Sequence, residues 1–418
     1  MNVQHNVIDP NSGCWPENSV ARVPYWVYQD RANYERELKR LFEGATWNLV
    51  CLEADILNKG DYRTNHIGAL PVIVVRAADG SINCFENRCA HRGALIAFDD
   101  GGNVQNNFKC IYHAWSYDLA GNLRGIAFEH GINGLGGMPG DFRRENFSPR
   151  KLRTTTLGGL VFATLSPDTP PIEDYLGAEI LQRFKRVLNR PIRVMGRFVQ
   201  PLPSNWKLYF ENVRDTYHAS LLHLFFATFR ITRLTQGGGI IVSPDGAHHA
   251  SYTIAAPEGA NASAYREQGI RSERDDYKLA DPSLLESVNE FDDPIQLQIL
   301  SIFPATVLQQ IYNCLAVRQI VPKGPDRMEL HWTYFGYADD TAEMTQRRLK
   351  QQNLVGPAGF VSMEDGCVPG FVQRGIASAG DKVSVIEMGG DAVESQRTRA
   401  TEAAVRGFWK VYRERMGY

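Results

Sequence analysis

Apolar and polar residues alternate along the chain in two different ways, and the change between them predicts two kinds of domain. Residues 34–42 (YERELKRLF) carry apolar side chains at helical spacing and predict a short amphipathic helix. From Trp47 to Leu165 the chain consists of short apolar or alternating runs, such as LPVIVVRA and GGLVFATL, which Gly, Asp and Asn turn signals interrupt. This second pattern is typical of an all-β domain.

The remainder of the chain mixes strand-like and helical runs, which predicts a larger α+β domain after the proline-rich segment SPDTPPIEDYLG. The strand-like runs are QLQILSIF, VLQQIYNCLAVRQIV and MELHWTYFGY, and the helical runs are TAEMTQRRLKQQNLV and TEAAVRGFWKVYRERM. Residues 257–293 are polar, so we expect a long, mobile surface excursion near a site entrance. We divide the chain into an N-terminal segment and helix that pack on the larger domain (1–43), the all-β domain (44–165) and the α+β domain (166–418).

Charge and cysteine usage exclude several classes of partner. The 418 residues include 45 Lys and Arg against 47 Asp and Glu, without the clustered cations of a nucleic-acid surface. No signal peptide and no apolar run of roughly 18 residues is present, so we expect a cytoplasmic protein without membrane contact. Seven cysteines are an odd number for a disulfide framework, so metal ligation explains paired spacings better.

Four potential metal ligands lie in the all-β domain, as Cys89-Ala-His91 and Cys110-Ile-Tyr-His113. Two thiolates and two imidazoles suit a tetrahedral structural zinc ion. They also suit a Rieske centre, in which the cysteines hold one iron of a 2Fe–2S cluster and the histidines hold the other. Imidazoles in place of two thiolates raise the reduction potential, so such a centre passes single electrons near a surface.

A second pair of histidines lies in the segment from Asp215 to His223, which reads DTYHASLLH. Five positions on a straight helix turn through about 140 degrees beyond a full turn, so His218 and His223 would point apart. A π-bulge or a helix end between Ala219 and Leu222 would bring them together. Asp215 lies on the face of His218 and can accept a hydrogen bond from a ligand imidazole. Taken alone, however, two histidines are more often ordinary core or surface residues.

A carboxylate much further along the chain can complete that site. Glu364 and Asp365 lie in PAGFVSMEDG, an apolar and small-residue stretch where an unpaired charge is costly. Two histidines and one carboxylate form the facial triad that leaves positions open on ferrous iron for oxygen and substrate. We expect Asp365 to be the third ligand.

These motifs resemble those of the α subunits of Rieske aromatic ring-hydroxylating oxygenases: CAHRG with CIYHAWSY, NWKLYFENVRDTYHASLLH, and PAGFVSMEDG. The resemblance covers essentially the whole chain and looks closest to terephthalate, anthranilate, salicylate and ortho-halobenzoate oxygenases. It implies an α+β protein with an all-β Rieske domain and a catalytic domain of antiparallel sheet and helices (helix-grip or START-like). The implied ligands are Cys89, His91, Cys110 and His113 for the 2Fe–2S cluster, and His218, His223 and Asp365 for mononuclear iron.

The resemblance also implies an assembly. Family members form head-to-tail trimers in which the Rieske centre of one subunit faces the iron of its neighbour. Asp215 would act as a catalytic residue by linking His218 or His223 to a Rieske histidine across that interface. We expect an α3β3 assembly with a small β subunit, and electrons from NAD(P)H through a reductase, directly or through a ferredoxin.

The implied reaction is the addition of O2 to an aromatic carboxylate by a dioxygenase. Monohydroxylation of the salicylate type uses the same ligands and is the first alternative. A Rieske electron-transfer protein without catalysis is a rival of a different class, although it would need no second domain. A zinc hydrolase that uses both sets of histidines is a further rival.

Arginine can meet a planar carboxylate with two parallel donors, so arginines in apolar segments are candidate substrate ligands. Arg318 lies in the strand-like run CLAVRQI, and Arg399 resembles a carboxylate-contacting arginine of terephthalate-type enzymes. A salt bridge to a nearby Asp or Glu is the alternative for either. We place His248 and His249 in a surface turn, PDGA. Candidate apolar walls, which could equally be plain core, are Leu222, Phe225, Phe226, Leu300, Ile302 and Leu308.

Overall fold

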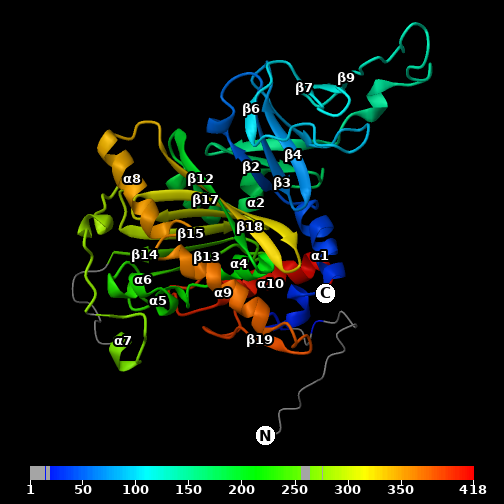
Figure 1. The fold of residues 1–418 in the computed structure, drawn as a ribbon. Coiled ribbons are helices and arrows are strands. Elements are labelled where there is room, and N and C mark those ends of the chain that lie inside the picture. Colours follow the sequence, from blue (N-terminus) through cyan, green and yellow to red (C-terminus); the bar gives the residue numbers. More distant parts are fainter. Residues whose placement is uncertain (1–14, 16–18, 256–263, 275) are drawn as a thin grey trace. The chain divides into compact units, whose positions relative to one another are not determined.

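Both parts of the chain are built around antiparallel sheets (Figure 1). The computed structural model describes residue 15 and residues 19–255, 264–274 and 276–418. The chain folds as two compact units, one of residues 42–172 and one that joins the described residues before 42 to residues 173–418. The functional boundaries suggested by the sequence, at 43/44 and 165/166, stay predictions. Among the described residues, no helix is long and apolar enough to cross a membrane.

The smaller unit is built of antiparallel strands, as its alternating sequence predicts. Seven strands form one sheet in the order β2-β11-β10-β5-β4-β3-β6, and three form a second in the order β7-β8-β9. The bounds are β2 Asn48–Leu52, β3 Asp61–Ile67, β4 Leu70–Arg76, β5 Ile82–Glu86, β6 Gly101–Asn103, β7 Asn107–Lys109, β8 Ser116–Asp118, β9 Leu123–Gly125, β10 Lys151–Leu157 and β11 Leu160–Thr164. The core contains Ile73, Phe85 and Phe108 and extends to Cys89 and Cys110. Packing therefore fixes both cysteines.

The larger unit contains a seven-stranded sheet in the order β12-β18-β17-β16-β15-β14-β13. Every neighbouring pair is antiparallel, which confirms the predicted α+β domain. The bounds are β12 Ile192–Leu202, β13 Gly238–Val242, β14 His249–Ile254, β15 Ile295–Ile302, β16 Thr306–Ile311, β17 Cys314–Gly324 and β18 Arg327–Tyr337. β17 is buried along nearly its whole length, which explains its near-continuous apolar sequence.

Helices cover both faces of this sheet. Gln298 of β15 donates to the carbonyl of Arg183 in α3 (Ala178–Val187), whereas Arg318 of β17 bonds to Tyr209 of α4 (Trp206–Asn212). The strand register puts Gln298 and Arg318 on opposite faces, so α3 and α4 lie on opposite sides. The helices α8 (Ala342–Val355) and α10 (Ala403–Met416) lie where the sequence predicts them (Figure 1).

A further helix, α9 (Ser362–Gly375), has a sequence that argues against a helix, because it contains Pro369 and several glycines. Pro369 cannot donate to the carbonyl four residues earlier, which belongs to Asp365. The glycines allow close packing, since a Cβ on Gly366 would lie 2.5 Å from Nε2 of Gln200 in β12. Tertiary packing therefore holds α9 in place where its helix propensity is weak.

The predicted N-terminal helix is confirmed with an earlier start. α1 (Arg31–Glu37) begins after Asp30, whose carboxylate accepts a hydrogen bond from the N–H of Asn33. One π-helical turn (Leu38–Phe42) continues it. A helix of this length is marginal alone, so packing within the larger unit must stabilise it.

Glu37, at the end of α1, forms an ion pair with Lys207 of α4, and both side chains are completely buried (Nζ–Oε1 2.6 Å). The same carboxylate accepts hydrogen bonds from Trp206 Nε1 at 2.8 Å and from the hydroxyl of Tyr412 in α10 at 2.5 Å. Burial outweighs the attraction to Glu37 and lowers the pKa of Lys207. The cluster joins three helices and fixes the start of α4, which leads to the second pair of histidines.

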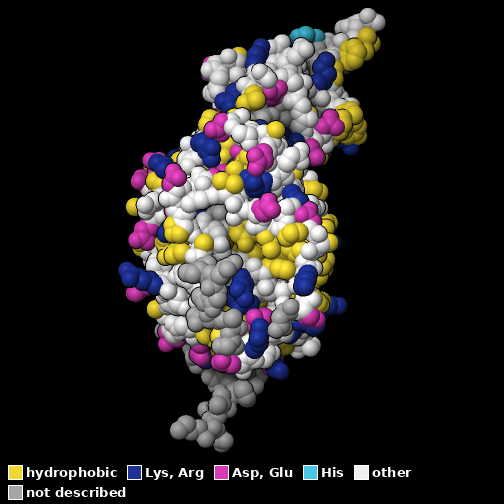
Figure 2. All heavy atoms as spheres, turned by 90° about the vertical axis from the view of Figure 1, so that its left-hand side faces the viewer, with side chains coloured by type: hydrophobic (Ala, Val, Ile, Leu, Met, Phe, Trp, Pro, Cys, Tyr) yellow, Lys and Arg dark blue, Asp and Glu magenta, His cyan; other side chains and the backbone are white. Residues whose placement is uncertain are grey.

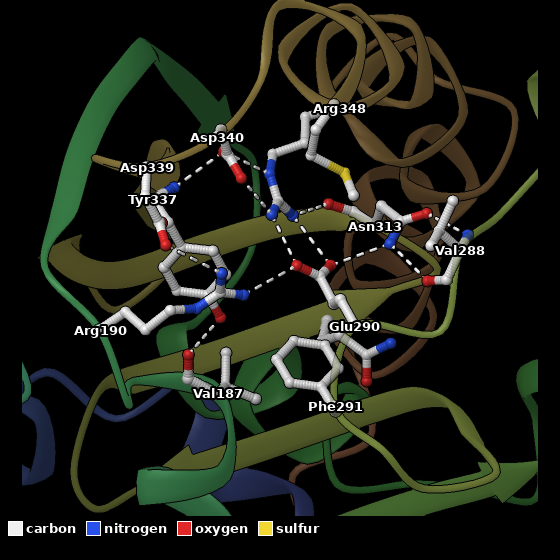
Figure 3. A network of polar contacts seen from close by, with 12 residues as sticks. Val187, Arg190, Val288, Glu290, Phe291, Asn313, Tyr337, Asp339, Asp340 and Arg348 are labelled. Atoms are coloured by element: carbon white, nitrogen blue, oxygen red, sulfur yellow. Dashed lines mark hydrogen bonds and ion pairs between the residues drawn. The ribbon is translucent and has the colours of Figure 1, made fainter.

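The described part of the predicted surface excursion contains two short helical turns, α7 (Ala264–Glu267) and η5 (Pro282–Leu285). Residues 257–263 and 275 lie outside the described residues, and the predicted mobility stays a prediction. The end of the excursion is anchored by Glu290, which pairs with Arg348 of α8 (2.6 Å) and accepts from Asn313 (2.9 Å) (Figure 3). This network fixes the chain just before β15 begins.

Lysine and arginine side chains are interspersed with aspartate and glutamate over the face shown in Figure 2. Some of the most exposed large apolar side chains belong to the smaller unit, with Ile111 75%, Phe128 72% and Leu135 78% exposed. Ile111 and the exposed Tyr112 lie between Cys110 and His113 in sequence.

Candidate functional site

Two loops of the smaller unit carry the four predicted cluster ligands and share one backbone conformation. In each, the cysteine N–H donates to the carbonyl five residues later, at 2.7 Å from Cys89 and 2.9 Å from Cys110. The residue four positions after the cysteine donates back to the cysteine carbonyl and has a positive φ, 74° at Gly93 and 58° at Ala114. Each loop is a closed turn that fixes its cysteine.

The side chains of the two loops meet with sulfur inside and imidazole outside. Cys89 and Cys110 are buried, whereas His91 and His113 are exposed and their ring centroids lie 4.4 Å apart. Burial and the neighbouring Cys89 raise the pKa of the Cys110 thiol, a cost that a metal relieves by binding the thiolate. The hydroxyl of Tyr117 lies 3.2 Å from Cys89 Sγ. This donor set fits a 2Fe–2S cluster whose histidine-bound iron is nearer the solvent.

In the larger unit, the helical segment after α4 breaks at the second histidine, as the spacing of the pair requires. α5 spans Ala219–Leu222, and His223 follows with an extended backbone (φ −81°, ψ 99°) before α6 (Leu224–Thr228) begins. The predicted helix end is confirmed, although it lies at His223 and not between Ala219 and Leu222. The imidazoles of His218 and His223, which a straight helix would point apart, have centroids 5.4 Å apart.

His218, His223 and Asp365 converge, each offering one ligand atom within 4.8 Å of the other two. Oδ1 of Asp365 lies 3.4 Å from Nε2 of His218 and 3.1 Å from Nε2 of His223. Two ligands bound at about 2.1 Å and at right angles lie about 3.0 Å apart, so these spacings fit one metal ion. Burial alone would raise the pKa of Asp365, but His223 and His218 outweigh it and hold that pKa far below its ordinary value. The anionic carboxylate between two imidazoles suits a divalent cation.

Each of the two histidines has a further carboxylate beside its outer ring nitrogen, Nδ1. Nδ1 of His223 lies 2.7 Å from Oε2 of Glu364, and Nδ1 of His218 lies 3.3 Å from Oδ2 of Asp215 without the alignment of a hydrogen bond. Burial alone would lower the pKa of His218, but Asp215 and Asp365 outweigh it and raise that pKa to about 10. A carboxylate at the outer nitrogen fixes the imidazole orientation. Sequence reasoning weighed Glu364 only as a metal ligand and missed this position.

Two residues of α4 that the sequence reasoning did not single out also face this region. Nδ2 of Asn212 lies 3.3 Å from Oδ1 of Asp365, and the hydroxyl of Tyr209 accepts from Nη1 of Arg318 at 2.7 Å. Their spacing of three residues puts both on one face of α4. Asp215 follows Asn212 after three more residues. This repeated spacing is the sequence signal that could have identified Tyr209 and Asn212 as neighbours of the site.

A cavity adjoins the three converging side chains, and both predicted substrate arginines line it. Arg318 and Arg399 are 3% and 4% exposed. The guanidinium of Arg318 lies over the ring of Trp332, and that of Arg399 donates to Thr232 and to the carbonyl of Arg233. In the described part of the chain neither arginine pairs with a carboxylate, so the salt-bridge alternative finds no support among those residues.

The cavity wall carries hydrogen-bond donors that have no partner. They are Nε2 of Gln309, Nε of Arg318 and Nε of Arg399. No buried side-chain oxygen of the described wall is left in the same state. Burial also lowers the pKa of Arg399 to about 10, a cost that a bound anion would relieve. Because buried polar groups are nearly always paired, the wall fits a ligand that is an anion and an acceptor.

Most of the expected apolar wall residues do not face this cavity. Phe226 lines it, but Leu300, Ile302 and Leu308 are buried on the opposite face of the sheet, where Leu300 and Leu308 are paired. Leu222 and Phe225 lie outside the wall as well. Strand side chains alternate between faces, and the apolar runs do not reveal which face meets the cavity. The apolar wall instead consists of Val213, Ala219, Leu297, Ile299, Ile311 and Val361.

The expected surface position of His248 and His249 is wrong, because both side chains are completely buried. Nε2 of His248 bonds to the carbonyl of Tyr175 at 2.8 Å, and its Nδ1 accepts from the N–H of Phe303. Nδ1 of His249 bonds to Ser301 Oγ at 2.6 Å. Burial lowers the pKa of His248 to about 4, so it is neutral. The turn ends before this pair, and β14 begins at His249.

Comparison with known proteins agrees with both groups of ligands. Residues 46–134 match the family described as Rieske [2Fe-2S] domain, and residues 189–418 match the ring hydroxylating alpha subunit (catalytic domain). The chain is 56% identical over 403 residues to the terephthalate 1,2-dioxygenase terminal oxygenase component subunit alpha 2 of Comamonas sp., covering 96% of this chain and 97% of that protein. It is 40% identical over 415 residues to the salicylate 5-hydroxylase large oxygenase component of Ralstonia sp., covering 98% and 97%.

The fold agrees with a solved structure of the same architecture. Naphthalene 1,2-dioxygenase from Rhodococcus sp. bound to indole superposes with a TM-score of 0.78 at 22% identity, covering 96% of this chain and 95% of that one. At this identity the likeness concerns the fold alone. Together with the two family matches, the paired ligand groups show that the chain belongs to the ring-hydroxylating oxygenase alpha subunits, oxidoreductases that carry a Rieske 2Fe–2S cluster and a mononuclear iron.

Proposed function

We propose that this subunit adds O2 to an aromatic dicarboxylate of the terephthalate type. The observation that carries the proposal is the cavity beside His218, His223 and Asp365, whose unpartnered donors include two arginines and whose remaining wall is largely apolar. The relative named for terephthalate, at 56% identity, supports the same substrate class.

The two arginines approach the cavity from opposite corners of one sheet face. Arg318 is in register, across β16 and β15, with His249 of β14. Arg399 bonds to Thr232, which pairs at 2.9 Å with Thr253, four residues along β14 from His249. Three strand spacings of about 4.8 Å and four residues of about 3.4 Å therefore separate the two corners. Two carboxylates in para positions point in opposite directions, towards two such corners.

We assign the Rieske cluster to Cys89, His91, Cys110 and His113, and the mononuclear iron to His218, His223 and Asp365. When bound, the iron supplies oxygen activation with electrons that the cluster delivers. Arg318 and Arg399 bind and orient the ring, and the apolar wall keeps water from it. Glu364 holds the proton of His223 on Nδ1, which leaves Nε2 free to bind metal.

Replacing Arg318 or Arg399 with methionine should raise KM for terephthalate about 10- to 100-fold, because each change removes a charge-assisted contact with a carboxylate. The absorption of the iron–sulfur cluster should stay unchanged. Steady-state oxygen uptake with purified reductase measures KM, and benzoate is the matched control substrate because it can engage only one arginine. Unchanged kinetics in both variants would reject the anchor assignment.

Replacing Glu364 with glutamine should weaken binding of a divalent metal about 10- to 100-fold, because a neutral amide holds the outer N–H of His223 less strongly. Titration of Co2+ into metal-free protein measures the affinity. Glu343→Gln, at a side chain that is 81% exposed, is the control. Equal affinities in the wild type and both variants would show that Glu364 has no part in holding His223.

We propose the head-to-tail trimer with a small β subunit, α3β3, and electrons from NAD(P)H through a reductase. The exposed imidazoles of His91 and His113, with apolar Ile111 beside them, support a contact surface at the cluster. Asp215, next to His218, is the proposed bridge between the two metal sites. Light scattering should give the mass of an α3 trimer or, with the small subunit present, of an α3β3 hexamer. A fully active monomer would contradict both the assembly and the bridging role.

Monohydroxylation is the second candidate, because a relative that covers 98% of the chain is named for a salicylate hydroxylase. Both reactions use the same ligands and differ in how the ring lies at the iron. The number of oxygen atoms from O2 in the product separates them.

A further inference from the structure

Gln309 of β16 is buried in the cavity wall, with 1% of its surface exposed. Its amide nitrogen has no hydrogen-bond partner in the described structure. By contrast, hydroxyl groups of the wall do have hydrogen-bond partners. Thr253, for example, bonds to Thr232, and Ser362 bonds to the carbonyl of Val355. A buried amide left unpaired is costly, so this nitrogen points to a partner that the cavity receives.

The strand register places Gln309 beside Arg318. Gln309 is directly opposite Ala316 of β17 and therefore diagonal to Arg318 on the same face. Diagonal neighbours in an antiparallel pair are about 7–8 Å apart, within reach of one another for long side chains. Ala316 is small and leaves room between them, and on the other side Gln309 faces apolar Ile299 of β15. The amide and the guanidinium can thus converge on one acceptor.

We propose that Gln309 determines substrate specificity by donating a hydrogen bond to the same substrate carboxylate that Arg318 binds. The proposal rests on the proposed function of the cavity. A carboxylate has two oxygens and about four acceptor positions, so it can take the donors of a guanidinium and an amide together. A hydrogen, methyl or halogen substituent offers no such acceptor. The combination therefore selects a ring that carries a carboxylate at the Arg318 end.

The test is Gln309→Met, which keeps the length and removes the donor. Binding of terephthalate, measured by calorimetry, should weaken about 10- to 100-fold, and KM should rise by a similar factor while kcat changes less than about twofold. Gln298→Met is the matched control, because Gln298 is equally buried on the adjacent strand but faces α3. It should leave terephthalate binding as in the wild type.

Double variants identify the carboxylate involved. In an Arg318→Met background the Gln309 effect should largely vanish, whereas in an Arg399→Met background it should persist in full. The inference would be overturned if Gln309→Met weakened terephthalate binding by the same factor in both backgrounds. It would also be overturned if the single variant Gln309→Met bound terephthalate as tightly as the wild type. If wild-type protein with both metal sites loaded binds no aromatic carboxylate, the proposed function fails. If it binds terephthalate and Gln309→Met binds it equally well, only this inference fails.

Discussion

Replacing Asp365 with alanine is expected to abolish oxygenation, by about three orders of magnitude or more, while the iron–sulfur spectrum stays intact. Asp365 is the carboxylate between the two imidazoles, at 3.4 and 3.1 Å from their Nε2 atoms. Without it, two neutral imidazoles remain, and a two-histidine site holds ferrous iron weakly. Product yield and iron content per chain are the measurements.

The cluster serves as an internal standard, since its four predicted ligands lie in the other unit of the chain. Iron content should fall from three atoms per chain towards the two of the cluster. Asp381→Ala, at an exposed position outside the cavity wall, is the control and should keep full activity. An Asp365→Ala protein that retains three iron atoms and normal turnover would show that the third ligand lies elsewhere.

Replacing Lys207 with methionine should lower the free energy of unfolding by about 3–5 kcal/mol, the largest stability effect we expect from one substitution. The change leaves the carboxylate of Glu37 completely buried without its cation. Trp206 also bonds to that carboxylate and is one of seven tryptophans, so intrinsic tryptophan fluorescence should report denaturant-induced unfolding.

The paired variant Glu37→Gln with Lys207→Met removes both charges and should recover much of the lost stability. Such recovery follows from the lowered pKa of Lys207, which indicates that burial already penalises its charge. Equal losses in the single and paired variants would mean that helix packing, and not the unpaired charge, accounts for the effect.

The sequence predicts the local structure around the candidate ligands, because the spacing of those residues constrains the backbone. A straight helix cannot bring His218 and His223 together, so the pair itself requires the helix end that α5 has. The alternating runs likewise predict the antiparallel sheets, because a period of two is the property of a strand.

The remaining features depend on tertiary packing, which local patterns do not carry. α9 is a helix despite Pro369, because Gly366 lets it pack on β12. Leu300 and Leu308 belong to the opposite face from the cavity, a choice that one position of strand register decides. His248 is buried because a backbone carbonyl and an N–H satisfy its ring, which its turn-like sequence context does not reveal.

The most direct test of the central claim is product analysis by mass spectrometry under labelled O2. The protein, loaded with both metal centres and supplied with NAD(P)H and a reductase, would be given terephthalate, salicylate and benzoate. We predict a terephthalate product that contains two labelled oxygen atoms, with little turnover of the other acids. No product from any aromatic carboxylate, with the cluster reduced and the mononuclear iron present, would contradict the assigned function.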